Sequence, residues 1–286
     1  MIEIPALWVA AIVYSCEIAI LCIGFTLTYL TAKIPNFAHG TYAGVGIYIS
    51  FTMARIFGYS PYIGFPLAFF LGGVVSVVIF IFVISLLGRL GGGAVVITIS
   101  TLAIQILLTS ILNVYAYWIV KKYNIYAMSF LLKENDVEVG GYAGIFPISL
   151  SICIVSVLML HFLLKKTKLG VAMRSTAEDS ELSSILGINT TSIQIYSWFL
   201  TGGLACLAGA MIPMWFMSAP TTGAYIMTSV MAGSILGGLD SMYGAIVGGF
   251  GIGLSEILLT NFLQEEIGIW VGEYRPLIPM IVMIIV

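Results

Sequence analysis

Long apolar runs, interrupted by only a few charged stretches, constrain the fold of this chain more than any other feature. Of its 286 residues, 60% are hydrophobic and 8% are charged, whereas soluble domains are about 25% charged and about 45–50% apolar. Most of the charges fall in three stretches, residues 121–138, 165–181 and 265–275. Because so apolar a surface is not stable in water, the runs between these stretches predict an integral membrane protein.

We expect an all-α membrane protein, a polytopic bundle of about eight to nine transmembrane or re-entrant helices, because a spanning helix needs about 20 mostly apolar residues. The second and seventh segments are short or broken by glycine, so they are candidates for re-entrant helices buried in protein. The whole chain, residues 1–286, is expected to form one transmembrane domain. The predicted helices cover residues 7–30, 42–57, 62–87, 94–120, 145–164, 194–216, 224–239, 243–262, and a last segment that begins near Pro276.

The distribution of lysine and arginine predicts the orientation of the bundle. The strongest basic cluster near a span end runs from Lys165 to Arg174, and short basic loops stay in the cytoplasm. The loop at about 165–193 is therefore predicted to be cytoplasmic, and counting spans places the loop at about 121–144 and Glu3 outside. The outer loop also holds three lysines, against the rule, but three acidic residues accompany them.

Several classes of function receive no support from the composition. The four cysteines stand singly within apolar runs, so we expect no metal site and no disulfide framework. The formal net charge of −2 and the absence of a long basic cluster do not suggest binding to nucleic acid. We also expect no resident cofactor.

Glycines recur at four-residue spacing in the C-terminal part of the chain. This spacing lets two helices approach until their backbones touch, so it predicts tight helix crossings. A hinge role during transport is the alternative interpretation. The pairs are Gly233 with Gly237, Gly244 with Gly248, and Gly249 with Gly253.

Residues 180–187 predict a short amphipathic helix in the cytoplasmic loop. Ser180 is a favourable N-cap, Glu181 complements the positive end of the helix dipole, and Gly187 suits the left-handed residue that ends a helix. Such a helix is expected to dock into a groove of another protein, or else to pack on its own bundle. Its apolar face consists of Leu182, Ile185 and Leu186.

This stretch resembles the Glu-Ala-Ala-x-x-x-Gly loop of ABC importer permeases, since residues 181–187 are Glu-Leu-Ser-Ser-Ile-Leu-Gly. The chain resembles, more closely, the permease subunits of branched-chain amino acid ABC transporters. Two further segments match that family in the same order, residues 34–40 (Ile-Pro-Asn-Phe-Ala-His-Gly) and residues 237–245 (Gly-Gly-Leu-Asp-Ser-Met-Tyr-Gly-Ala). Leu182 and Ser183 replace the usual two alanines, and Asp240 stands where the family often has glycine.

The resemblance implies a permease domain that carries out no chemistry and moves branched-chain or related small amino acids. It implies four kinds of partner: a homologous permease in a heterodimer, two ABC ATPase subunits, an extracytoplasmic solute-binding protein and the lipid bilayer of a prokaryotic cell membrane. The chain itself lacks a phosphate-binding loop ending in Lys-Ser or Lys-Thr. The residues that the resemblance assigns to ATPase coupling are Arg174, Glu178, Asp179, Glu181 and Gly187.

Polar residues inside apolar segments are candidates for a translocation pathway. Glu17 and Glu256 lie within predicted spans, where an ionised carboxylate costs several kcal/mol unless it faces a cavity or a partner. For Glu17 we keep three alternatives open: a pathway or subunit interface, a structural hydrogen bond, and a role in proton coupling. Further polar candidates are Gln105 and Asn113 on one face of a predicted helix, and Asn36 and His39, for which a structural role at a helix start is favoured.

Two other functions remain to be weighed against an ABC permease. An ion-coupled secondary transporter of small polar solutes would use intramembrane acids such as Glu17 and Glu256 and would need inverted repeats, and we find no clear repeat between the halves. An intramembrane enzyme is disfavoured, because His39 and His161 are far apart in sequence and no nucleophile or carboxylate accompanies either one in a recognisable motif.

Overall fold

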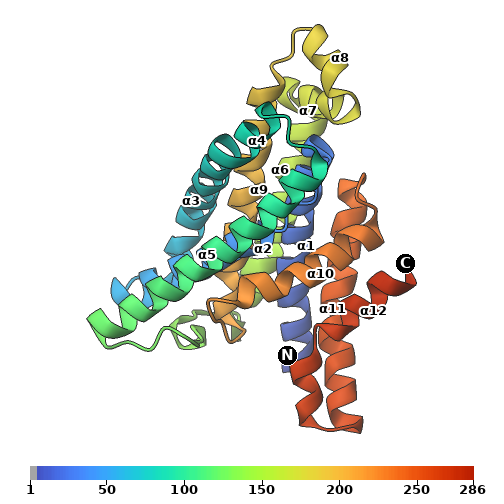
Figure 1. The fold of residues 1–286 in the computed structure, drawn as a ribbon. Helices are drawn as coiled ribbons and strands as arrows, with labels where there is room; N and C mark the ends of the chain where they lie inside the picture. The colour runs from blue at the N-terminus through green and yellow to red at the C-terminus, as the bar shows by residue number, and fades with distance from the viewer. Residues whose placement is uncertain (1–4) are drawn as a thin grey trace.

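A computed structural model describes residues 5–286, so Glu3 lies outside the described residues. The chain folds into an elongated bundle of helices (Figure 1). Within the described part, six continuous helical segments are long and apolar enough to cross a membrane. They are Ala6–Ala32, Pro61–Arg89, Ala94–Tyr123, Ile145–Lys166, Thr190–Met214 and Met242–Glu266.

The helices follow one another with short connections. In chain order they are α1 (Ala6–Ala32), α2 (His39–Phe51), α3 (Gly64–Ile79), α4 (Ser85–Arg89), α5 (Ala94–Tyr123), α6 (Ile145–Lys166), α7 (Lys168–Glu178), α8 (Ser180–Ile185), α9 (Thr190–Met211), α10 (Thr222–Gly237), α11 (Met242–Glu266) and α12 (Leu277–Ile285). Wider π-helical turns at Thr52–Ile56 and Phe80–Ile84 extend α2 and join α3 to α4. Tighter 3₁₀ turns occur at Pro61–Ile63, Lys133–Asn135, Ile212–Met214 and Ile269–Tyr274.

Each segment predicted from the apolar runs corresponds to a helix, but three of these helices are too short to count as full spans. These are α2, α10 and α12, so the six long segments make up part of the expected eight to nine transmembrane or re-entrant helices. Two loops hold more structure than expected. The 165–193 loop contains two helices, α7 and α8, instead of one, and the 121–144 loop contains an antiparallel hairpin of β1 (Glu138–Val139) and β2 (Tyr142–Ala143).

Helix α1 forms the centre of the bundle, since most of its side chains are buried and α6, α9, α10 and α11 all pack against it. Helices α2 and α3 pack on α9, and α5 lies along α2 with most of its surface exposed. Figure 1 shows α7 and α8 projecting at one end of the bundle. The start of α1, the 121–144 segment and the turn between α11 and α12 lie toward the opposite end (Figure 1).

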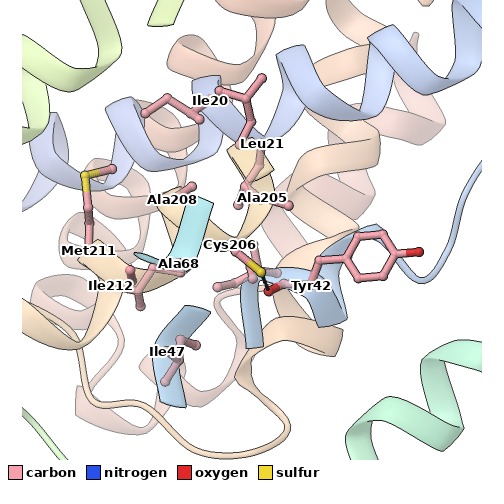
Figure 2. Close-up of a cluster of buried hydrophobic side chains, with 14 of the residues drawn as sticks. Ile20, Leu21, Tyr42, Ile47, Ala68, Ala205, Cys206, Ala208, Met211 and Ile212 are labelled. Carbon is pink, nitrogen blue, oxygen red and sulfur yellow. Dashed lines mark hydrogen bonds between the residues drawn. The ribbon is translucent and has the colours of Figure 1, made fainter. Parts of the chain in front are cut away.

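The core combines large aliphatic side chains with small ones where α1, α2, α3 and α9 meet (Figure 2). Ala205, Cys206 and Ala208 are fully buried on α9, and their small side chains let α2 and α3 approach closely. The thiol of Cys206 donates a hydrogen bond to the carbonyl oxygen of Tyr42 at 2.8 Å (Figure 2). All four cysteines are free and buried.

The predicted tight crossings are confirmed between α10, α11 and α1. A Cβ atom added at Gly237 would collide with the backbone of Gly244, and one added at Gly248 would collide with the carbonyl oxygen of Gly233. Gly249 faces the backbone of Ala19 on α1 in the same way. Contact between backbones supplies the packing energy that the hydrophobic effect cannot supply within lipid.

Candidate translocation and coupling sites

Helix α8 in the projecting loop has well-defined ends. Asp179 caps its N-terminus, because Oδ1 accepts a hydrogen bond from the backbone N–H of Leu182 at 2.9 Å. The prediction of Ser180 as the cap was wrong by one residue, since Ser180 is the first helical residue. Both side chains can cap a helix, and only the backbone turn decides between them.

Gly187 ends α8, as its place in the sequence predicts. Gly187 has a φ of +87°, its N–H donates to the carbonyl oxygen of Ser184, and the N–H of Ile188 donates to that of Ser183, both at 3.0 Å. This pair of bonds is the Schellman pattern that ends many helices. A side chain added at Gly187 would meet open space. The left-handed backbone conformation, and not a lack of room, therefore explains why glycine stands there.

The apolar face of α8 does not pack on its own bundle. The exposed fractions of Leu182, Ile185 and Leu186 are 53%, 82% and 70%. The opposite face is held against α7, where the hydroxyl groups of Ser175 and Ser183 lie 2.7 Å apart. A face this apolar and this exposed at the end of a helix is typical of a protein contact.

Other residues assigned to coupling lie beside a cleft between the loop and the bundle. Arg174 and Glu178, both on α7, line a cavity of about 440 Å³ between α1, α6, α7 and the start of α11. Glu181 lies in the first turn of α8. The structure therefore places the charged residues of this loop on adjoining helices at one end of the molecule.

The segment at residues 34–40 forms a fixed helix start rather than an open polar site. The side-chain oxygen of Asn36 accepts from the N–H of Ala38 at 3.1 Å, and Nε2 of His39 lies 2.9 Å from the carbonyl oxygen of Leu21 on α1. Both side chains are buried. These contacts position the first turn of α2 on α1.

The segment at residues 237–245 forms the turn between α10 and α11. Gly238 has a φ of +86°, and the hydroxyl of Ser241 caps α11 by accepting from the N–H of Gly244 at 3.1 Å. Asp240, which departs from the family pattern, pairs with Lys33 at 3.0 Å. Because Lys33 directly precedes residues 34–40, this pair brings the matched segments 34–40 and 237–245 to the same end of the bundle.

A continuous line of polar groups follows one face of α1. Tyr14, Glu17, Leu21, Gly24, Thr28 and Thr31 are spaced alternately by three and four residues, so they share one side of the helix. We call this line the α1 seam. It rises about 26 Å along the axis at 1.5 Å per residue, which is close to the thickness of a bilayer core.

Partners from three other helices meet the α1 seam. Thr28 donates to the hydroxyl of Thr201 at 2.8 Å, and Thr31 lies 2.9 Å from the hydroxyl of Ser197, both partners on α9. The carbonyl oxygen of Gly24 also accepts from Thr201 at 3.1 Å. With His39 of α2 at Leu21 and Glu256 of α11 at Tyr14, hydrogen-bonding groups extend across most of the apolar core.

Glu17 is the exception within the α1 seam. Its side chain is only 1% exposed, and neither carboxylate oxygen has a hydrogen-bond partner among residues 5–286. A buried ionised carboxylate without partners is costly. In this conformation the side chain is enclosed by its own chain, so a partner could reach it only after the helices move apart.

Glu256, in contrast, is the centre of a connected cluster. Its Oε1 accepts from the hydroxyl of Tyr14 at 3.0 Å and from Nε of Arg275 at 2.7 Å, and its Oε2 accepts from the hydroxyl of Ser229 at 2.7 Å. The guanidinium carbon of Arg275 lies 4.0 Å from the centre of the Tyr14 ring and 5.4 Å from that of Phe216. The cluster joins α1, α10, α11 and the segment before α12.

Comparison with known proteins identifies the family. The family described as the branched-chain amino acid transport system / permease component matches residues 7–286. The chain belongs to this family. No solved structure matches it.

Relatives of this permease are named as permease proteins of transport or import systems. One is a probable branched-chain amino acid transport permease protein LivH from Methanocaldococcus jannaschii, 35% identical over 96% of this chain and 87% of its own. The high-affinity branched-chain amino acid transport system permease protein LivH of Escherichia coli K12 is 25% identical over 87% of this chain and 83% of its own. The autoinducer 2 import system permease protein LsrC of Salmonella paratyphi B is 29% identical over 39% of this chain and 31% of its own.

Gln105 and Asn113 of the permease do not join the polar cluster. Both lie partly buried on α5, which packs mainly on α2, and Nδ2 of Asn113 donates to the carbonyl oxygen of Thr109 in the same helix. Within the described residues, neither side chain has a hydrogen bond to α1, α9, α10 or α11. The structure therefore brings Glu256 to the α1 seam and leaves these two amides outside it.

Two features of the permease escaped sequence reasoning. The α1 seam could have been found from the alternating spacing of three and four residues between Tyr14 and Thr31. The pairing of Glu256 with Arg275 could not, because it depends on the chain reversing after α11 to bring the two side chains together.

Proposed function

We propose that this chain is the permease subunit of an ABC importer that moves branched-chain or related small amino acids across a prokaryotic cell membrane. An extracytoplasmic solute-binding protein delivers the substrate, a homologous permease completes the pathway, and two ABC ATPase subunits hydrolyse ATP. The chain itself catalyses no reaction. Membership of the permease family supports this proposal, and so does the function named for its relatives.

The observation that carries the coupling role is the exposed apolar face of α8. Leu182, Ile185 and Leu186 lie on a helix whose two ends are fixed by Asp179 and Gly187. A rigid helix transmits a displacement, whereas a loose loop would absorb it. The ATPase is expected to receive this face in a hydrophobic groove.

The charged coupling residues then surround this contact. Arg174, Glu178 and Glu181 are exposed on α7 and α8, where they can pair with opposite charges of the ATPase. Asp179 acts through the helix, since its carboxylate is used as the cap. Gly187 acts through the backbone conformation that ends the helix.

The orientation follows from the same loop. With residues 165–193 in the cytoplasm, residues 121–144 lie outside, and α5 turns its exposed apolar side chains toward lipid or the second permease. Helices α2, α10 and α12 complete the proposed eight to nine transmembrane or re-entrant helices. Because α2 and α10 pack against the central helices α9 and α11, they suit the role of re-entrant elements buried in protein.

The α1 seam is the proposed lining or gate of the pathway. Thr28 and Thr31 are closed against α9, so the seam is shut in this conformation. Glu17 would gain an interaction partner only when the helices rearrange or the second permease binds. Asn36 and His39 keep α2 in register with α1 during that movement.

Reconstitution of the four-subunit complex in proteoliposomes tests the proposal. We expect uptake of radiolabelled leucine. This uptake should require ATP on the side of the membrane that carries the ATPase subunits and the solute-binding protein on the opposite side. A complex with an ATPase variant that cannot hydrolyse ATP serves as the control. Leucine uptake by this variant complex at the rate of the intact complex would contradict the proposal.

One observation favours a second candidate, an ion-coupled secondary transporter of small polar solutes. The buried, unpartnered carboxylate of Glu17 resembles a site that binds and releases a proton or cation. The two candidates separate in proteoliposomes that contain the permeases without the ATPases. Uptake driven there by a proton or sodium gradient would support the second candidate.

A further inference from the structure

A small cavity opens beside the Glu256–Arg275 pair. Its volume is about 160 Å³, and it lies between α1, the segment before α10, α10, α11 and the segment before α12. In the proposed orientation this is the outer half of the bundle, because α11 begins next to the cytoplasmic loop and Glu256 lies more than half-way along it. The cavity therefore faces the side on which substrate would arrive.

The guanidinium group of Arg275 has donors to spare. A guanidinium carries five N–H groups, and Nε of Arg275 donates to Glu256. Its Nη2 is buried and has no partner among residues 5–286. Leaving a buried charged donor without an acceptor costs at least about 1–3 kcal/mol. The Arg275 side chain as a whole is 24% exposed and lines the cavity, so its remaining donors suit an anion.

The group is also held in place. One edge is fixed by Glu256 at 2.7 Å, and its plane lies near the aromatic rings of Tyr14 and Phe216. A guanidinium in a fixed position is a directed, charged donor for a carboxylate. The site is thus preorganised for a carboxylate on the side of Arg275 that lines the cavity.

The rest of the cavity suits the other parts of a small amino acid. The hydroxyl of Ser229 and the carboxylate of Glu256 provide acceptors for an ammonium group. Phe216, Tyr225 and Ile226 provide an apolar wall. The volume of about 160 Å³ can hold one small molecule.

We propose that this cavity is a binding subsite for a zwitterionic aliphatic amino acid. The α-carboxylate binds the part of the Arg275 guanidinium that lines the cavity, the ammonium group binds Ser229 and Glu256, and the aliphatic side chain packs on Phe216 and Tyr225. The inference rests on the proposed function, because it assigns that function's substrate to particular residues. Arg275 was not among the candidates from the sequence.

A purely structural pair is the alternative, in which Arg275 only ties the segment before α12 to α11. The two interpretations differ in what added amino acid does. If the pair is only structural, leucine does not bind in the cavity. If the cavity is a subsite, leucine binds there, whereas leucinol, in which an alcohol replaces the carboxylate, does not.

Cysteine labelling in the complete complex tests this inference. Met217 lines the cavity and is 69% exposed, so Met217→Cys gives a reactive thiol, while the four native cysteines are buried and give little background. Tyr59→Cys, at an exposed position outside the cavity lining, is the matched control. The rate of labelling by a membrane-impermeant maleimide is measured without the solute-binding protein, with leucine or leucinol added.

We expect leucine at ten times its dissociation constant to slow labelling of Met217→Cys about tenfold, by simple occupancy. Labelling of Tyr59→Cys should not change, and leucinol should protect neither. Adding Arg275→Lys should weaken protection by leucine at least about tenfold, because a compact ammonium group lacks the separate planar donors that let arginine hold Glu256 and face the cavity at once.

Unchanged labelling of Met217→Cys at saturating leucine, or equal protection by leucinol, would overturn the subsite. If Arg275→Lys fails to assemble, the comparison of leucine with leucinol in the otherwise native complex still decides. ATP-driven leucine uptake without any protection would leave the importer standing and remove only the subsite. Protection by leucine without ATP-driven uptake would support the subsite and contradict the importer.

Discussion

At the scale of single residues, the most specific predictions concern Gly187 and the Glu256–Arg275 pair. Gly187 adopts a left-handed conformation in open space, so its replacement is penalised by backbone strain and not by a clash. For Gly187→Val we expect a local cost of about 1–2 kcal/mol and weaker binding of the ATPase. Co-purification of the ATPase with the permease measures this.

Gly187→Asn is the matched control, because asparagine tolerates the left-handed conformation. It should retain most ATPase binding. If the valine and asparagine variants bind the ATPase equally well, the conformation of Gly187 has no part in coupling.

The Glu256–Arg275 pair is expected to contribute far more than a surface pair. Glu256 is almost fully buried, so Glu256→Gln leaves the partly buried Arg275 cation without its counter-charge and should cost about 3–5 kcal/mol. Asp240→Asn breaks the exposed pair with Lys33 and should cost less than about 1 kcal/mol. Unfolding of the purified variants in detergent measures both.

The double variant Glu256→Gln with Arg275→Met completes this experiment. Removing both charges should recover part of the stability lost in the single variant, because no uncompensated charge remains buried. Equal losses for Glu256→Gln and Asp240→Asn would show that the buried pair is not specially coupled.

Sequence reasoning at this scale succeeded where local chemistry decides. Gly187 was found because a helix end requires one kind of conformation, and Glu256 because a charge inside an apolar run is rare. It missed Asp179 as the cap, since two adjacent residues could both serve, and it missed Arg275, since only the folded chain brings it to Glu256. The separation of Gln105 and Asn113 from the α1 seam is likewise a property of how α5 packs.

At the scale of helices, the crossing of α10 and α11 gives a matched pair of glycines. A methyl group at Gly248 would collide with the backbone of α10, whereas one at Gly251 on the same helix would meet nothing within 4 Å. Gly248→Ala should therefore destabilise the bundle by about 1–3 kcal/mol, while Gly251→Ala should be neutral or slightly stabilising. Thermal unfolding in detergent compares the two variants.

A similar loss of stability in both variants would contradict the crossing described for α10 and α11. The spacing of the glycines was enough to predict this crossing, but not its partners. That α11 also approaches Ala19 of α1 follows from the three-dimensional packing alone.

The helices themselves were largely predictable, because apolar runs of sufficient length have few other ways to satisfy their backbone in lipid. Boundaries followed glycine, proline and charges to within a few residues. Helix α7 and the β1–β2 hairpin were missed, because both lie in polar loops where hydropathy gives no signal. The α1 seam was overlooked because its members are of different chemical types.

At the scale of the whole molecule, the two proposed sites lie in opposite parts of the fold. One end carries α7 and α8, with an apolar face left uncovered, and the opposite half carries the Glu256 cluster and its cavity. Helix α1 connects them through its seam. This arrangement suits a subunit that receives mechanical work at one end and exposes a substrate pathway at the other.

The central claim is that α8 passes the work of ATP hydrolysis from a partner to this chain. Cross-linking of Ile185→Cys tests it most directly, because this side chain is 82% exposed and the native cysteines are buried. We expect Ile185→Cys to form a disulfide with a cysteine placed in the groove of the ATPase, and this bond to stop leucine uptake until a reductant restores it. Labelling of Ile185→Cys by an impermeant reagent from outside intact cells, with no cross-link to the ATPase, would contradict the account.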